Sequence, residues 1–361
     1  MKKQYTILVL ALWAVLTLCL WFLPAKASSD AERRPLAQKP EIRMDTILNG
    51  KFMADFEDYT LDQFPLRDRF RTVKSLFHQY ILGQKDNNGI YLADGYAAQQ
   101  EYPLNEDSLR HALERFGRLY SKYLVGSDVY MAIVPDKGYY LAESSGHLAM
   151  DYEKLYRLFA EGMPWAQQID LRPVLSIDDY YRTDTHWRQE NLIPAAQSIC
   201  AAMGRSLPQE DAFTASRMTQ PFYGVYYGQA ALPMAPDSIT LLENDLLDRC
   251  TVFDHETEKN GSIYDLPKLD GKDPYEVYLS GPKSLLTIEN SQASADRELI
   301  VFRDSFGSAI IPLLLADYAR VTVVDIRYIQ LDVLDRFLEF RGQDVLFLYS
   351  TLVLNNSETI K

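Results

Sequence analysis

The segment LIVFRDSFGSA, which spans Leu299–Ala309, decides the fold class of this chain. Its first four residues are continuous aliphatic and aromatic side chains, a pattern typical of a strand buried on both faces of a parallel sheet. The polar group Arg-Asp-Ser ends the strand, and the small residues that follow permit a tight turn into a helix. The pattern therefore predicts a strand, a turn and a helix in succession, with Ser305 exposed at the carboxyl end of the strand.

Three further apolar runs have a similar length and composition, at residues 129–134, 321–326 and 345–349. Amphipathic stretches lie between the runs and begin or end at residues that cap helices. We expect these helices over residues 105–126, 188–204, 305–318 and 330–341. The alternation of strands and helices predicts an α/β fold, a three-layer sandwich around a mostly parallel sheet.

Ser305 is the candidate nucleophile at this strand end. A turn into a helix would offer its backbone N–H groups, including those of Ser305 and Gly307, as donors to an oxyanion. A serine that only caps the following helix would produce the same local pattern. A catalytic interpretation of Ser305 therefore depends on a base elsewhere in the chain.

His186 is the strongest candidate for that base among the five histidines of the chain. Asp184 lies two residues before it, and residues at this spacing face the same way in an extended segment. Asp184 would then fix the tautomer that leaves the other ring nitrogen free to take a serine proton. A helix beginning near Arg188 would place its positive end beside His186 and favour the neutral base. An Asp and His pair that only locks a turn is the alternative.

The N-terminus has the pattern of a targeting segment. Lys2 and Lys3 precede an uncharged run over residues 5–23, and Ala25-Lys26-Ala27 follows. This pattern is typical of a signal peptide, and the run is also long enough to span a bilayer as a helix. Residues 1–27 are therefore predicted to be a cleaved signal or a retained membrane anchor. Both alternatives place the remainder outside the cytoplasm.

The rest of the chain is predicted to form a tether and one domain. Residues 28–45 are rich in Ser, Ala, Pro and charge and lack periodicity, which indicates a tether. No later stretch has the composition of a second linker, so residues 46–361 are predicted to be one domain. Cys200 and Cys250 are the cysteines of this part, expected as a buried free thiol on a helix and its possible disulfide partner. No metal or cofactor is expected.

The chain is acidic, with 37 basic and 50 acidic residues in 361 and a net charge of −13. Without residues 1–27 it has 34 basic residues against the same 50 acidic ones, a net charge of −16. Nucleic-acid binding requires clustered Lys and Arg to displace phosphate counterions. The composition therefore excludes nucleic acid as an expected partner.

Taken together, Asp184-Thr185-His186-Trp187 and Arg303-Asp304-Ser305-Phe306-Gly307 resemble motifs of the DHHW family. This family is SGNH hydrolase-like and related to the alginate O-acetylation proteins of Gram-negative bacteria. Further similarities lie at residues 83–92, 134–137, 324–328 and 344–356, so the resemblance covers most of residues 46–356. It departs from the family at Thr185, where the name motif has His, and at Arg303, where many SGNH proteins have Gly.

The resemblance implies a flavodoxin-like sandwich and a Ser305, His186 and Asp184 triad in permuted chain order. It also implies oxyanion donors at Ser305 and either Gly307 or Arg327. The candidate substrate-binding residues are Tyr181, Lys137, Arg303 and Arg327.

The function expected from this resemblance is O-acetyl transfer to a polysaccharide of the cell envelope or the extracellular space. A multipass membrane acyltransferase would supply the acetyl group, and the N-terminal helix would hold the chain at the membrane. Two alternatives remain open. Water would replace the sugar as acceptor in a carbohydrate esterase, and a catalytically silent protein would act as a membrane-tethered scaffold for polysaccharide assembly.

Overall fold

The computed structural model describes residues 2–293 and 295–361 and divides the chain into two compact units. The larger unit contains Ile90–Tyr226 and Pro236–Lys361, and the smaller contains the residues up to Gly89 together with Tyr227–Ala235. The domain predicted over residues 46–361 thus spans parts of both units. The contacts divide at residue 89 rather than at residue 45, because helices that follow the predicted tether pack with the N-terminal segment.

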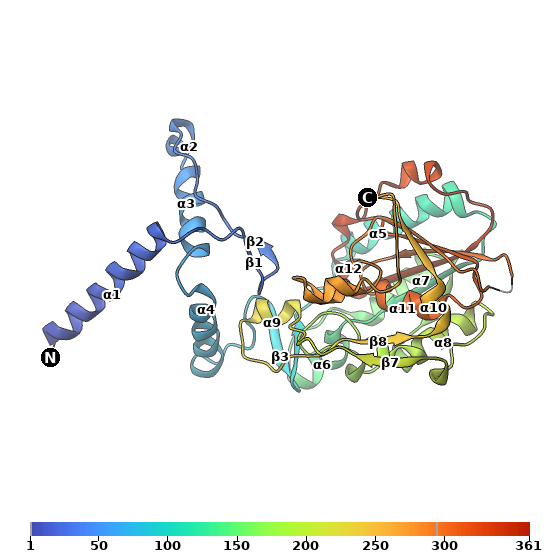
Figure 1. The fold of residues 1–361 in the computed structure, drawn as a ribbon, viewed down its shortest axis with the longest axis horizontal. Coiled ribbons are helices and arrows are strands. Elements are labelled where there is room, and N and C mark those ends of the chain that lie inside the picture. Colours follow the sequence, from blue (N-terminus) through green and yellow to red (C-terminus); the bar gives the residue numbers. More distant parts are fainter. Residues whose placement is uncertain (1, 294) are drawn as a thin grey trace. The chain divides into compact units, whose positions relative to one another are not determined.

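An eight-stranded sheet forms the centre of the larger unit (Figure 1). Five strands run parallel, in the order β13-β12-β14-β5-β6. Three strands extend the sheet beyond β13 in antiparallel pairing, in the order β11-β9-β10. The strands are β5 (Val129–Val134), β6 (Gln167–Asp170), β9 (Thr251–Asp254), β10 (Lys259–Gly261), β11 (Leu285–Glu289), β12 (Glu298–Arg303), β13 (Arg320–Val324) and β14 (Asp344–Ser350). The predicted α/β fold with a mostly parallel sheet is confirmed, and each of the four predicted apolar runs is a strand.

The order of the parallel strands explains the permuted order of the candidate triad. If β12 is counted as the first strand, the order β13-β12-β14-β5-β6 becomes 2-1-3-4-5, which is the flavodoxin order. The first parallel strand in this chain, β5, therefore takes the place of the fourth strand of the flavodoxin order. Segments that follow β5 and β6 consequently come earlier in the sequence than Ser305, which follows β12.

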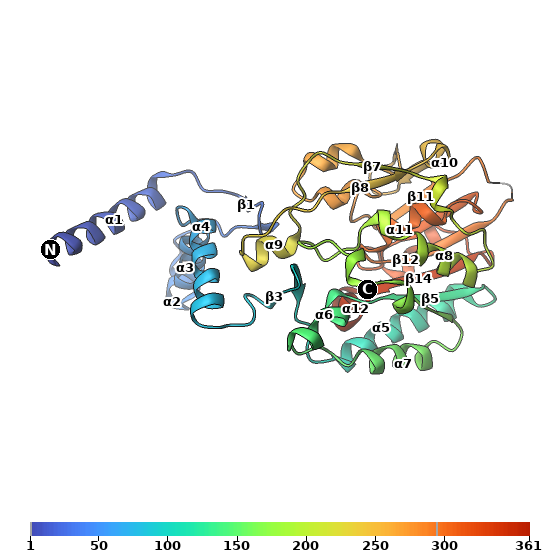
Figure 2. The same cartoon turned by 90° about the horizontal axis from the view of Figure 1, so that it is seen from below.

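Helices cover both faces of the sheet and complete the three layers (Figure 2). One face packs alternate residues of the central strands against α5 (Glu106–Leu119) and α7 (Tyr152–Gly162). The opposite face packs the intervening residues against α8 (Ile193–Ala202) and the segment that begins with α11 (Gly307–Ile310). Because successive strand residues point to opposite faces, the continuous apolar runs bury both sets of side chains.

Several predicted helices are shorter in the structure. The helix expected over residues 305–318 is only α11 followed by a 3-10 turn at Ile311–Leu314, where Pro312 lacks the amide that an α-helix needs. The helix expected from residue 188 begins at Ile193, with Pro194 in its first turn. Residues 330–341 form only the 3-10 turn Leu331–Arg336.

Two antiparallel strand pairs were not predicted, the hairpin of β3 (Ile90–Ala93) with β4 (Tyr96–Gln99) and the pair of β7 (Thr214–Arg217) with β8 (Thr240–Glu243). The first turns at Asp94-Gly95, which both have positive φ, a sequence signal for a tight hairpin. The remaining helices of this unit are α6 (Lys137–Ser145), α10 (Asp245–Arg249) and α12 (Thr351–Asn355), while α9 (Val225–Ala230) crosses the boundary between the units.

The smaller unit is helical. It contains α1 (Lys2–Phe22), α2 (Met44–Leu48), α3 (Lys51–Asp62) and α4 (Arg67–Leu76), which continues as a π-helical turn at Phe77–Ile81. The 20 residues Lys3–Phe22 are long and apolar enough to cross a membrane. This agrees with a membrane-anchored or secreted protein and leaves cleavage open.

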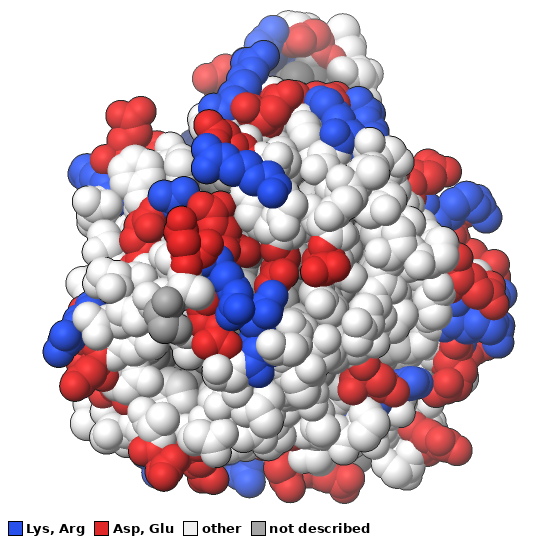
Figure 3. All heavy atoms as spheres, turned by 90° about the vertical axis from the view of Figure 1, so that its right-hand side faces the viewer, with Lys and Arg blue, Asp and Glu red and all other residues white. Residues whose placement is uncertain are grey.

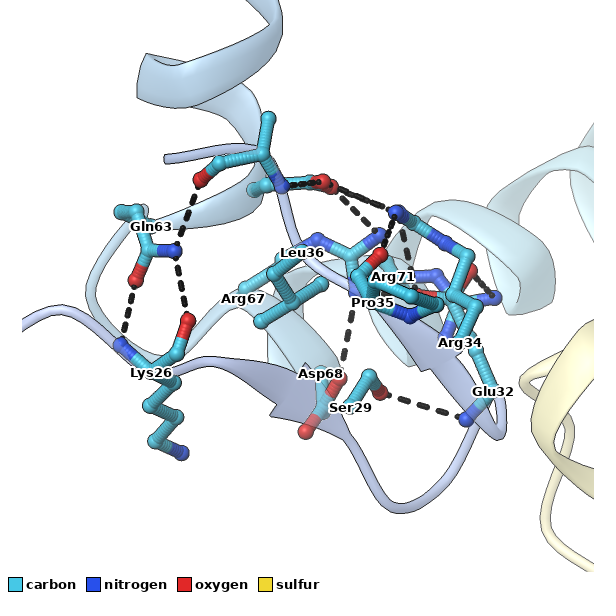
Figure 4. Close-up of polar contacts among 12 residues, drawn as sticks. Lys26, Ser29, Glu32, Arg34, Pro35, Leu36, Gln63, Arg67, Asp68 and Arg71 are labelled. Carbon is cyan, nitrogen blue, oxygen red and sulfur yellow. Dashed lines mark hydrogen bonds and ion pairs between the residues drawn. The ribbon is translucent and has the colours of Figure 1, made fainter. Parts of the chain in front are cut away.

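The predicted tether is partly folded onto α3 and α4 (Figure 4). Its short strands β1 (Ser28–Ser29) and β2 (Arg34–Pro35) pair with each other. Arg34 forms an ion pair with Asp62, and the same carboxylate accepts the backbone N–H of Ala37. Part of the segment predicted as a tether is therefore fixed by a polar network that its composition did not reveal.

The charges of the chain are mixed over the face shown in Figure 3. On this face, Lys and Arg side chains lie beside Asp and Glu side chains and do not gather into a broad basic surface.

Candidate active site

The site lies where parallel strands end. β12 ends at Arg303, and Ser305 follows after one residue. β14, its neighbour in the sheet, ends at Ser350, and β5 on the far side of β14 ends at Val134. The carboxyl ends of these strands meet at one edge of the sheet, which is the place where α/β proteins bind ligands.

Ser305, His186 and Asp184 lie within hydrogen-bond distance of one another in series. His186 Nε2 is 2.8 Å from Ser305 Oγ, and His186 Nδ1 is 2.6 Å from Asp184 Oδ1. An ionised carboxylate only accepts hydrogen bonds, so Nδ1 carries the proton and Nε2 of the neutral ring accepts from the serine hydroxyl. The structure brings the three predicted residues together in the geometry that their predicted roles require.

Asp184 is fully buried and oriented by its surroundings. Its Oδ1 also accepts the backbone N–H of His186, and its Oδ2 accepts the backbone N–H of Val225. Gly224 allows this approach, because a Cβ at that position would lie 2.2 Å from the Asp184 Cβ. The segment 224–225 therefore has to lie directly against the acid.

The loop that carries Asp184 and His186 is a closed turn and not an extended segment. Tyr180 and Trp187 form an isolated antiparallel bridge, and the Tyr181 N–H donates to the His186 carbonyl. The predicted Asp184 and His186 contact exists, but the turn produces it. The argument from a helix end near residue 188 is wrong, because α8 begins only at Ile193.

Two side chains join this loop to the Ser305 turn. Trp187 Nε1 donates to the Phe306 carbonyl at 2.9 Å, and Gln189 Nε2 donates to the Ala309 carbonyl at 2.8 Å. Both side chains are fully buried. These bonds fix the base and the hydroxyl relative to each other, although 119 residues separate them.

Aromatic rings enclose the imidazole. Tyr275 stacks on His186 with ring centroids 3.9 Å apart and an interplanar angle of 7°, and Phe306 packs at 5.0 Å. Burial raises the pKa of Tyr275 well above its ordinary value, so this ring stays neutral. The Tyr275 hydroxyl has no hydrogen-bond partner among the described residues. The stacking therefore restricts rotation of the His186 ring.

Asp304 shapes the turn at Ser305. Its Oδ1 accepts the Phe306 N–H, and its Oδ2 accepts both the N–H and the hydroxyl of Ser350. No acceptor for the Ser305 N–H lies within the described part of the chain, which leaves this amide available as an oxyanion donor. The Gly307 N–H already donates to the Asp304 carbonyl at 3.1 Å.

The prediction of Gly307 as an oxyanion donor is therefore not supported. A Cβ at Gly307 would lie 2.8 Å from the Arg303 Cβ. Close packing against Arg303 thus explains the glycine at this position.

The predicted roles of Arg303 and Arg327 need correction. Arg303 is fully buried, donates to the Gly281 carbonyl and lies 4.0 Å from the Asp325 carboxylate. Arg327 forms a two-point ion pair with the same carboxylate. A buried guanidinium is not accessible to a substrate, and Arg327 is already neutralised. Both residues stabilise the strand ends instead.

Lys137 and Tyr181 are likewise interior residues. Lys137 Nζ donates to the Tyr181 carbonyl at 2.9 Å and lies 5.0 Å from the Tyr226 ring centroid. Burial lowers the pKa of Lys137 to about 7, opposed by the carboxylates of Asp184 and Asp237. The Tyr181 ring is fully buried and packs edge-on against Phe222. The predicted substrate contacts of Lys137 and Tyr181 are therefore not supported.

Several positioning residues were missed in the sequence analysis. Asp237 accepts the N–H groups of Arg182 and Thr183, and also the Thr183 hydroxyl. Asp237 lies in a loop and Tyr275 in the 3-10 turn Pro274–Val277, both more than 50 residues from His186, and no local pattern marks them. The spacing of Asp184 and His186 therefore identified the candidate base. It did not identify the distant residues that position the base.

No group of three or more His, Cys, Asp or Glu that could hold a metal ion is found in residues 2–293 and 295–361. Cys200 and Cys250 are both buried free thiols. Burial raises the pKa of Cys200 to about 12 and that of Cys250 to about 11. The alternative of a disulfide between them is not realised in the structure.

The fold and site define the class of this chain as an α/β sandwich with a serine, histidine and aspartate in series at its strand ends. The sequence profile described as "DHHW protein" matches residues 172–324. The resemblance to the DHHW family is thereby confirmed. Among curated proteins, none matches the chain.

Solved structures share the fold. A DHHW family protein from Eubacterium siraeum is 21% identical, with a TM-score of 0.59, over 76% of this chain and 95% of that one. Bacillus cereus PatB1 is 17% identical, with a TM-score of 0.60, over 75% of this chain and 98% of that one. A structure of PatB1 with a sulfonyl adduct matches at 17% identity and a TM-score of 0.59, over 73% and 97% of the two chains.

Proposed function

We propose that this chain is an extracytoplasmic acyltransferase in which Ser305 carries the acyl group. The observation that carries the proposal is the continuous path from Asp184 through His186 to the Ser305 hydroxyl, with separations of 2.6 and 2.8 Å. Each group has the neighbour that its role requires, and the acid is buried away from competing solvent.

In the first half-reaction, Ser305 Oγ attacks the carbonyl carbon of an acyl ester, and His186 Nε2 takes the hydroxyl proton. Asp184 stabilises the resulting imidazolium. His186 then gives its proton to the departing alcohol oxygen, which leaves Ser305 acylated. In the second half-reaction, an acceptor hydroxyl loses its proton to His186 and attacks the acyl group, and Ser305 recovers its proton as the new ester leaves.

The Ser305 N–H supports this chemistry as a donor to the tetrahedral oxyanion. The acyl group is acetyl and the acceptor a hydroxyl of an envelope or extracellular polysaccharide, as the family resemblance implies. A multipass membrane acyltransferase supplies the acetyl group from the cytoplasmic side. The apolar helix Lys3–Phe22 supports a location at the outer face of that membrane.

Sulfonyl fluoride labelling tests the nucleophile directly. Sulfonyl fluorides react with activated serine hydroxyls, and PatB1 has been solved with a sulfonyl adduct. We expect a sulfonyl group on Ser305, identified by peptide mass, and loss of labelling in Ser305→Ala and His186→Ala. Ser145→Ala is the matched control and should leave the labelling of Ser305 unchanged. The Ser145 hydroxyl also lies 2.9 Å from a histidine, His147, but it donates to the Leu141 carbonyl.

A second measurement separates transfer from hydrolysis. Purified protein is given a chromogenic acetyl ester with and without an oligosaccharide acceptor. Acetylated oligosaccharide supports transfer, whereas acetate alone supports the esterase alternative. Absence of both products and of Ser305 labelling would contradict both enzymatic functions and favour the scaffold alternative.

A further inference from the structure

Helix α4 and the turn that follows it carry an exposed apolar stripe. Leu66, Phe70, Val73 and Phe77 are each about half exposed or more, with fractional exposures of 59%, 47%, 63% and 50%. The spacing of Phe70, Val73 and Phe77 places these three on one face of α4 and the turn that follows it, and Leu66 precedes them as the N-cap residue of the helix. Aromatic and aliphatic side chains in such a row need a partner that removes them from water.

Basic residues border this stripe on both sides. Arg69 and Lys74 lie at the two edges of the helical face defined by Phe70 and Val73. Both side chains are exposed, and neither has an ion-pair partner in the part of the chain that the structure describes. The helix has four basic residues and one acidic residue, although the whole chain has a net charge of −13. Its charge is therefore opposite to that of the chain.

The opposite face of α4 packs inside the smaller unit. Ser75 is buried, and Arg67 and Arg71 form ion pairs with Glu32 at 2.5 and 3.2 Å. Arg71 also donates to the Gly228 carbonyl. These contacts fix the rotation of the helix about its axis, so the apolar stripe cannot turn inward.

The segment before α4 is hydrogen-bonded to the segment after the apolar helix α1 through Gln63 and Lys26 (Figure 4). Gln63 Oε1 accepts the backbone N–H of Lys26, and Gln63 Nε2 donates to the Lys26 carbonyl, at 2.8 and 2.9 Å. Lys26 follows the last residue of α1 by four positions, and Gln63 precedes the first residue of α4 by four. If α1 crosses a bilayer, α4 starts next to the surface of that bilayer.

We propose that α4 lies on the surface of the membrane that α1 enters, as a second and peripheral membrane contact. The stripe Leu66, Phe70, Val73 and Phe77 enters the boundary between headgroups and acyl chains, and Arg69 and Lys74 bind anionic phosphate groups. A basic amphipathic helix with aromatic residues on its apolar face has this mode of binding. Paired cations at the edges of the stripe favour a lipid surface over a second copy of the chain, which would present the same cations. The proposal does not depend on the proposed function, since none of these residues belongs to the candidate active site.

Fluorescence quenching in the full chain tests the proposal. A Cys19→Ser chain with Phe77→Cys carries an environment-sensitive probe in vesicles of phosphatidylcholine with or without phosphatidylglycerol. Cys200 and Cys250 are buried and remain unlabelled in the folded protein. Val73→Cys is the second probe position, and Asp68→Cys on the opposite face is the control. Quenchers are a nitroxide carried by the lipid and aqueous iodide.

We expect lipid nitroxide to quench the probes at 73 and 77 at least about twofold more strongly than the probe at 68, with the difference greatest in anionic vesicles. Arg69→Glu with Lys74→Glu is expected to remove the difference. The matched control is Arg110→Glu with Lys259→Glu, which reverses two exposed charges of the larger unit and is expected to preserve it.

Other results would overturn the proposal. Quenching of the probes at 73 and 77 by iodide in vesicles would show that lipid does not cover these positions. If the probes were then protected from iodide only in native membranes, a membrane protein would be the partner of the stripe. Shielding from both quenchers that falls on dilution would assign it to a second copy of the chain. Protection of the probes from both quenchers that persists without vesicles and on dilution would show that other parts of the same chain cover the stripe.

Discussion

At the residue scale, the site depends on Asp184 more than its position beside a histidine indicates. This carboxylate accepts two N–H groups of His186 and one of Val225, and Gly224 lies directly against it. Its main effect is to hold one tautomer and one ring orientation of His186. The catalytic importance of the acid therefore follows from the direction of its hydrogen bonds as well as from its charge.

Replacement of Asp184 by Asn tests this directly. The amide retains the shape of the side chain, but its NH₂ group favours the wrong histidine tautomer. We expect Ser305 sulfonylation and acetyl ester turnover to fall by about 10³-fold or more, as for other triads that lose their acid in this way. The midpoint of thermal unfolding should change by only a few degrees. A loss of less than tenfold in both rates would contradict the predicted role of Asp184.

Lys137 predicts a pH dependence of stability. Burial lowers its pKa to about 7 from 10.5, despite the nearby carboxylates of Asp184, Asp237 and Asp136. Between these two values the unfolded chain binds a proton that the folded chain does not. The free energy of unfolding should therefore rise with pH from about 7 towards 10, by up to about 1 kcal/mol per pH unit.

Denaturant unfolding at several pH values measures this slope. Lys137→Met should flatten it, whereas Lys259→Met, at an exposed position, should leave it unchanged. The buried neighbour Asp136 has a pKa raised to about 6, mainly by burial. Asp136 lowers the free energy of unfolding as pH rises from about 4 to 6, and this loss is complete above pH 6, so it does not affect the slope above pH 7. An equal slope in both Lys variants would contradict the assignment.

At the element scale, Trp187 and the 3-10 turn Gln189–Asn191 that follows it hold the nucleophile turn in place. Trp187 donates to the carbonyl of Phe306, which precedes α11, and Gln189 donates to the carbonyl of Ala309 within α11. Gln189 Oε1 also accepts the Leu242 N–H. The α-helix that the sequence predicted from residue 188 is absent at this place. Its absence leaves these side chains free to reach across to the Ser305 segment.

Trp187→Phe isolates one of these bonds because it keeps most of the packing. The Phe306 carbonyl then loses its buried donor, which should cost about 1 to 3 kcal/mol of unfolding free energy. We expect Ser305 labelling to slow by about tenfold as well, because the turn is less well fixed. Trp165→Phe is the control. Trp165 is half-buried and stacks on Tyr120, so labelling of that variant should be unchanged.

At the scale of the whole molecule, the described contacts of the candidate site lie within the larger unit. Ser305, His186, Asp184 and their supports belong to Ile90–Tyr226 or Pro236–Lys361. The smaller unit contains the apolar helix α1 and its polar network around Glu32 and Asp62. The residues of the candidate active site and those of the candidate membrane contacts therefore belong to different units.

Cleavage of the folded chain near the end of the first segment of the smaller unit, before Gly89, tests this separation. A site for a specific protease, inserted in the exposed segment Gln84–Asp86, allows cleavage after folding. The rate of Ser305 labelling should remain within about twofold of the uncleaved value, since no bond at the site is broken. The control is the same insertion without protease. A tenfold fall that appears only after cleavage would show that the smaller unit contributes to the site.

The sequence alone determined the fold class, the strands that end at the site and the three residues brought together there. These features follow from local signals, namely apolar runs of strand length and a pair of short polar motifs. Local signals also identified the apolar N-terminal helix. The boundaries of helices were less predictable, because Pro194 and Pro312 act on hydrogen bonds several residues away.

Only the tertiary structure decided which charged residues face a substrate and which are interior. Arg303 and Lys137 resemble ligand-binding residues in sequence, yet the first is enclosed beside Asp325 and the second donates to a buried carbonyl. Burial depends on strand order and on distant segments such as those of Asp237 and Tyr275. These segments meet His186 only after the permuted sheet has assembled, because contacts between residues far apart in the chain are set by packing rather than by local conformation.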